Sequence, residues 1–87
     1  MPVVAAFTLP GLRLWFWSHD HCPMHFHAEK TDQWEIRVDI MATTSAALSF
    51  TTRWGSGPSG REQKALRQRV VAHRLALVAE WSSKVMG

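Results

Sequence analysis

The side chains best suited to chemistry lie together between residues 15 and 27. This segment holds four of the five histidines, the only cysteine and two of the five tryptophans. Imidazole and thiolate are ligands for zinc, and imidazole can also accept or donate a proton near neutral pH. The composition of the segment therefore indicates either a metal site or an acid–base site.

A metal site would use the residues that end this segment. If residues 25–28 form a strand, its alternation places His25 and His27 on one side, and Cys22 is close enough in sequence to approach them. The predicted ligands are thus Cys22, His25 and His27, with zinc as the possible ion. The spacing matches no closed zinc motif, so we expect no obligatory cofactor, and an accidental grouping is the alternative.

An acid–base site would use a slightly different set of side chains. A histidine could act as base or acid in RNA cleavage, oriented by an aspartate, while Arg13 or Arg37 contacts a phosphate. The catalytic candidates are Asp20, His21, His25 and His27. The alternative interpretation is structural, because Asp and His in turns commonly hydrogen-bond the backbone and would here fix the loop around Pro23.

Alternation of apolar and polar residues predicts the strands that position this segment. We expect strands at residues 12–17, 25–28, 34–40 and 48–54. The segment between the first two is a predicted loop, a polar turn follows at residues 29–32, and the short connections favour an antiparallel meander. Ser59 and Glu62 have the spacing of a capping box, and the apolar pattern after them predicts one long helix ending near Lys84.

The predicted fold is a single α+β domain over residues 1–87, with an antiparallel sheet of three to four strands packed against one long C-terminal helix. Strand parity places eight apolar side chains under the helix: Leu12, Leu14, Phe16, Phe26, Ala28, Ile36, Val38 and Ile40. The helix face should contain Leu66, Val70, His73, Leu77, Trp81 and Val85, widened by Val71 and Val78. The opposite sheet face receives two tryptophans and two histidines, which the N-terminal segment, a dimer partner or a ligand could cover, or which could form a second hydrophobic cluster.

Charge and composition set the expected environment. The net charge is +3 and the sequence pI about 9.8, which permits nucleic acid or an acidic protein as partner. The helix cations Arg67 and Arg74 are expected to extend to solvent over their apolar stems. A single cysteine excludes an internal disulfide and favours a cytoplasmic location. We expect no signal peptide and no membrane anchor, because no apolar run approaches about 18 residues.

The segment Asp20-His21-Cys22-Pro23-Met24-His25-Phe26-His27 follows an aromatic strand and precedes a helix that contains Trp81. In this arrangement the chain resembles the bacterial family grouped as domain of unknown function 4160, whose pattern is aromatic-Ser-x-Asp-His-x-Pro-Pro-His-x-His. Met24 stands where the family has its second proline. Members resemble the small paired-gene proteins of toxin–antitoxin type loci, so the resemblance implies a protein partner.

The expected function is that of a small interaction protein, either a component of a toxin–antitoxin-like gene pair or a compact inhibitor of another protein. It would bind through the histidine-rich loop and the open sheet face, with Arg13, Trp15, Trp17, His19, His25, His27 and Arg37. The alternative is a metal- or histidine-dependent RNA-cleaving protein. Binding of nucleic acid by stacking on the tryptophans and formation of a homodimer are further possibilities.

Overall fold

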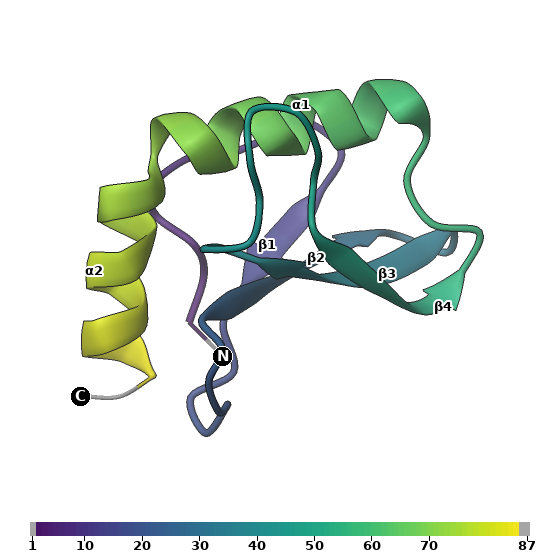
Figure 1. The fold of residues 1–87 in the computed structure, drawn as a ribbon. Coiled ribbons are helices and arrows are strands. Elements are labelled where there is room, and N and C mark those ends of the chain that lie inside the picture. The colour runs from purple at the N-terminus through teal and green to yellow at the C-terminus, as the bar shows by residue number, and fades with distance from the viewer. Residues whose placement is uncertain (1, 86–87) are drawn as a thin grey trace.

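The computed structural model describes residues 2–85 as a four-stranded antiparallel sheet with two helices (Figure 1). The strands follow chain order across the sheet: β1 Arg13–Trp15, β2 His25–Lys30, β3 Trp34–Asp39 and β4 Phe50–Gly55. The helices are α1 Gly60–Ala72, which lies over one face of the sheet, and α2 Arg74–Lys84, which turns down from its end (Figure 1). The predicted α+β class, including the fourth strand, is confirmed.

The strand ends differ from the predicted ones where the chain meets other segments. β1 is only three residues long, because the backbone beyond it pairs with the N-terminal segment: Phe16 N donates to Pro2 O at 2.8 Å. β2 continues through Glu29 and Lys30, which we had expected in a turn. The turn is shorter, and Asp32 closes it with a φ of 62°, a left-handed conformation that Asp tolerates better than most residues.

The core lies between α1 and the sheet face that strand parity assigned to it. The predicted side chains are buried there: Leu14, Phe16, Phe26, Ala28, Ile36, Val38 and Ile40. Leu12 packs partly buried against the same cluster, as does Val78. The helices contribute Leu66, Val70, Leu77 and Trp81. Val71 was expected to widen the apolar helix face and is instead exposed, because a helical neighbour of buried Val70 points about 100° away.

The prediction of one long helix is wrong, because His73 separates α1 from α2. His73 has φ −114° and ψ 20°, and its ring stacks on Phe7 with centroids 5.7 Å apart. The 13 residues of α1 extend about 20 Å, already the width of a four-stranded sheet, so a straight continuation would leave the sheet. The break turns α2 down beside the sheet, where Trp81 contacts Phe16 at 6.5 Å between ring centroids (Figure 1).

A bulge in β4 changes which side chains reach the outer face, defined here as the sheet face opposite α1. Glu35 pairs with Trp54 but Ile36 pairs with Thr52, which leaves Arg53 as an extra residue. Strict alternation from Thr52, the partner of core residue Ile36, would place Trp54 on the core side. Instead, the side chain is 42% exposed and its Nε1 donates to Glu35 Oε1 at 3.4 Å on the outer face.

The segment between β3 and β4 forms a loop beside α1 (Figure 1). Thr43 is buried at its base, and its Oγ1 donates to the Asp39 carbonyl at 2.8 Å. Arg67 donates to the carbonyl of Ala46, and Arg74 to that of Thr43. The expectation that both arginines simply reach solvent is therefore wrong, because the loop carbonyls next to the helices provide acceptors.

The N-terminal segment is a strap between β1 and α2. Val4 N donates to Leu14 O at 3.0 Å, and the Val4 side chain is buried in the core. The Glu80 carboxylate of α2 accepts from Ala5 N at 2.6 Å and from Ala6 N at 2.7 Å. Within residues 2–85, neither helix is long and apolar enough to cross a membrane.

Glu62 generates a prediction about stability. The predicted capping box is confirmed: Ser59 Oγ accepts from Glu62 N at 3.2 Å, and Glu62 Oε1 accepts from Ser59 N at 2.9 Å. Glu62 Oε2 also accepts from Lys30 Nζ at 2.8 Å, and this hydrogen bond is the largest cause that lowers the pKa of Glu62. The charged carboxylate thus joins α1 to β2.

We expect Glu62→Gln to lower the free energy of unfolding by about 1 kcal/mol at pH 7, because glutamine can keep the cap but not the charge. The pKa of Glu62 is lower in the folded state, so its contribution is complete above its ordinary pKa and is lost as pH falls through the lowered value. Urea unfolding at pH 7 and pH 3 should therefore show the difference shrinking in acid. Lys30→Gln should give the same profile, and a pH-independent difference would refute the assignment.

Candidate functional site

The candidate site lies on the outer face, where β2 crosses between β1 and β3. His27 is paired in register with Trp15 of β1 and with Arg37 of β3, and His25 is paired with Asp39. Since alternate residues of β2 point to opposite faces, both histidines point away from the core, as strand parity predicted.

The rings on this face form a compact aromatic cluster. Trp15 stacks on His27 with centroids 5.5 Å apart, and Trp17 contacts His27 edge-on at 6.2 Å. Trp81 of α2 approaches His25 from the other side at 5.2 Å. As a result Trp15, His25 and His27 are buried. Our expectation of a solvent-exposed face is wrong at these three positions. Their packing agrees with the alternative, a second hydrophobic cluster on this face.

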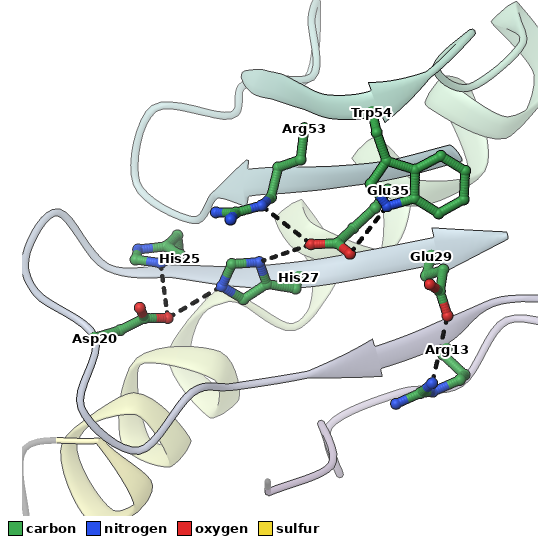
Figure 2. Close-up of polar contacts among 8 residues, drawn as sticks. All are labelled: Arg13, Asp20, His25, His27, Glu29, Glu35, Arg53 and Trp54. Carbon is green, nitrogen blue, oxygen red and sulfur yellow. Dashed lines mark hydrogen bonds and ion pairs between the residues drawn. The ribbon is translucent and has the colours of Figure 1, made fainter. Parts of the chain in front are cut away.

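Asp20, from the loop between β1 and β2, joins the two imidazoles (Figure 2). Its Oδ2 lies 2.9 Å from His25 Nε2 and 3.1 Å from His27 Nε2. His25 and His27 are 4% and 1% exposed, whereas the Asp20 side chain is 24% exposed. One donor atom from each residue lies within 4.8 Å of the others, so the three could together hold a metal ion. Solvent reaches the group from the side of Asp20.

The second nitrogen of each imidazole has a different environment. His25 Nδ1 lies 2.7 Å from the Pro23 carbonyl, so this nitrogen carries a hydrogen and ties the loop to β2. His27 Nδ1 has no hydrogen-bond partner, and the nearest carboxylate oxygen, Glu35 Oε2, is 3.8 Å away. Burial lowers the pKa of His27 although its hydrogen bond to Asp20 acts in the opposite direction, which keeps the ring neutral at neutral pH.

Glu35 is the centre of a second polar group next to the first. Its carboxylate lies 3.2 Å from Arg53 Nε and accepts from Trp54 Nε1 (Figure 2). Glu35, Arg53 and Trp54 were not predicted as site residues, because the β4 bulge that brings them together has no signature in the sequence. At the other side of the face, Arg13 pairs with Glu29 at 3.4 Å and lies 5.0 Å above the Trp15 ring.

The remaining candidates lie outside the buried group. His19, His21 and Cys22 are exposed in the loop between β1 and β2. The structure therefore brings together Asp20, His25 and His27 of the catalytic candidates, but not His21. Of the predicted metal ligands it brings together the two histidines, and Asp20 is the third member in place of Cys22. Arg13, Trp17 and Arg37 surround the group on the outer face.

Comparison with known proteins identifies a family. The family model described as domain of unknown function (DUF4160) matches residues 11–82, which include the whole sheet, the histidine-rich loop, all of α1 and most of α2. No curated protein and no solved structure matches the chain.

The burial of His27 predicts its effect on stability. His27→Ala should lower the free energy of unfolding by about 2–4 kcal/mol, because it leaves a cavity beneath Trp15 and Trp17. His19→Ala, at an exposed position of the adjoining loop, should change it by no more than about 0.5 kcal/mol. Denaturant unfolding followed by tryptophan fluorescence measures both variants. Equal effects at the two positions would contradict the packing described here.

Proposed function

The chain belongs to the DUF4160 family, and for this member we propose the role of a small interaction protein whose outer sheet face binds an acidic protein partner. One observation supports the proposal. Five side chains of the types most often found at binding hot spots remain accessible on the outer face. This set, called here the outer patch, consists of Trp17, Trp54, Arg13, Arg37 and Arg53.

The tryptophans of the outer patch would supply apolar contact area. Trp17 is 46% and Trp54 is 42% exposed, although each also contacts residues of its own face. An indole ring that is already positioned by its neighbours loses little conformational entropy when a partner covers it. The two rings lie at opposite edges of this face, one just after β1 and the other in β4.

The arginines of the outer patch favour a partner rich in carboxylates. Their side chains are 57%, 38% and 54% exposed at Arg13, Arg37 and Arg53, with ion-pair distances of 3.4, 3.8 and 3.2 Å. Partly exposed pairs of this kind contribute about 1 kcal/mol or less, so carboxylates of a partner could replace them. The net charge of +3 would speed association with an acidic surface.

The partner would be a second protein chain in the cytoplasm, either the other product of a toxin–antitoxin-like gene pair or a target that this protein inhibits. Both roles require the same surface chemistry. The exposed histidine-rich loop adjoins Trp17 and would extend the contact through His19.

The outer patch can be tested with variants of equal charge change. Arg53→Glu should weaken capture of the partner at least tenfold, because it places a like charge against acidic side chains. Lys64→Glu changes the net charge equally, but at an exposed position of α1, and should have no comparable effect. Affinity capture with cross-linking and mass spectrometry at two salt concentrations measures both variants.

The expected product is an acidic protein in 1:1 ratio, cross-linked to residues around the outer patch and released by added salt. Equal weakening by Lys64→Glu would refute the proposal. A second copy of this chain on the patch would also refute it. Size-exclusion chromatography with light scattering would then give the mass of a dimer for the wild type and of a monomer for Arg53→Glu.

A second candidate is RNA cleavage that depends on a metal or on histidines. The observation that favours it is the placement of Asp20 between His25 Nε2 and His27 Nε2, a grouping able to hold a proton or an ion beside a solvent-facing carboxylate. A phosphate could approach only from the side of Asp20, because both rings are buried.

This candidate predicts cleavage of single-stranded RNA by the purified protein. Asp20→Asn should slow it about 10²-fold or more, since the carboxylate would be the group in contact with the reacting atoms or their ion. Cys22→Ser, an exposed change in the same loop, should leave the rate unchanged. Gel assays with and without chelator separate metal from histidine dependence, and undiminished cleavage by Asp20→Asn would exclude this site.

A further inference from the structure

We propose that Asp20, His25 and His27 form a mononuclear site for a divalent transition-metal ion of the zinc class, with a coordination position left for water or another ligand. The inference does not rest on the protein partner proposed above, because the observations behind it concern side chains packed beneath the outer patch. It also stands whether or not RNA is cleaved, since it concerns binding of the ion alone.

The spacing of the donor atoms fits one ion. His25 Nε2 and His27 Nε2 lie 2.9 and 3.1 Å from the same carboxylate oxygen of Asp20. Ligand bonds of about 2.0–2.2 Å correspond to donor–donor distances of about 2.8–3.6 Å in tetrahedral or octahedral geometry. The two nitrogen–oxygen distances lie in this range. Asp20 is the most exposed of the three and comes from a loop, so its side chain can adjust to admit the ion.

The hydrogen bond of His25 prepares its Nε2 as a ligand. The Pro23 carbonyl can only accept, so the ring hydrogen resides on Nδ1. In the neutral ring Nε2 then presents a lone pair, yet it faces a carboxylate oxygen 2.9 Å away that also only accepts. Two facing acceptors require a positive charge between them. A metal ion bound to both satisfies this requirement and retains the Pro23 hydrogen bond.

His27 supplies a second, independent observation. Its Nδ1 is a polar atom without a hydrogen-bond partner in a side chain that is only 1% exposed. Coordination of an ion through Nε2 would place the ring hydrogen on Nδ1, which faces Glu35 Oε2 at 3.8 Å. Metal-binding histidines commonly donate their second N–H to a carboxylate in this way. Binding of the ion would therefore give the unpaired nitrogen a hydrogen that faces this carboxylate.

The donor set selects the class of ion. Two imidazoles and one carboxylate suit zinc and its neighbours, whereas calcium and magnesium prefer sites made of oxygen. Three protein ligands are the number typical of sites that retain an exchangeable water. Cys22 is exposed and is not part of the group, so no thiolate ligand is required.

Titration of untagged, chelator-treated protein with Zn²⁺, and separately with Co²⁺, tests the proposal. We expect one ion per chain, a dissociation constant below about 10 μM and a higher Tm in the presence of the ion. The Co²⁺ spectrum should lack a thiolate charge-transfer band. Proton NMR of the Co²⁺ form should show two shifted, exchangeable imidazole N–H signals, one from each bound histidine.

Two variants of the same loop provide the comparison. Asp20→Asn is nearly isosteric, and its amide can donate to His25 Nε2, so the metal-free variant should keep its Tm while its affinity for Zn²⁺ falls at least tenfold. Cys22→Ser should bind as the wild type does. The proposal is overturned if the wild type shows no stoichiometric binding below about 100 μM, which would assign the charge between His25 and Asp20 to a proton. It is also overturned if Cys22→Ser, rather than Asp20→Asn, removes binding, or if the shifted imidazole signals are absent.

Discussion

Burial of two imidazole rings on the outer face of β2 is the constraint that determines most of their surroundings. In a two-layer fold this face would ordinarily meet solvent, yet His25 and His27 are almost completely covered. A buried polar atom without a partner costs about 1–3 kcal/mol, and three of the four ring nitrogens have one, whereas His27 Nδ1 does not. The Pro23 carbonyl and Asp20 serve this purpose, and they fix the loop between β1 and β2 in doing so. The shape of the loop is thus determined by the hydrogen bonds that the two buried rings of β2 make with it.

The cover over these rings depends on the break between α1 and α2. Trp81 contacts Phe16 in the core and also His25 on the outer side, because α2 turns beside the sheet instead of continuing over it. Trp81 therefore contacts both the core and the outer face of the sheet. The strap that ends at β1 is held by α2 through Glu80, so the same helix closes the core and fixes the N-terminal segment.

The features that could be predicted from the sequence are those that depend on local periodicity and spacing. Parity along 12–17, 25–28 and 34–40 identified the core residues, and the Ser59–Glu62 spacing identified the start of α1. Features that depend on distant contacts could not be predicted in this way. His73 breaks the helix with neither glycine nor proline, and the β4 bulge moves Trp54 to the outer face. For the same reason Cys22, near in sequence, was chosen as the third ligand, whereas loop geometry places Asp20 there.

Glu35 connects the buried site to the accessible surface. Its carboxylate lies near His27 Nδ1 on one side and interacts with Arg53 and Trp54 on the other. An ion on His27 Nε2 would turn Nδ1 into a donor toward Glu35 and draw the carboxylate inward, which would weaken its hold on Arg53. Conversely, a partner that takes Arg53 would free Glu35 to accept from His27 and so favour the ion. Because such coupling is reciprocal, ion binding and partner binding would strengthen each other through one side chain.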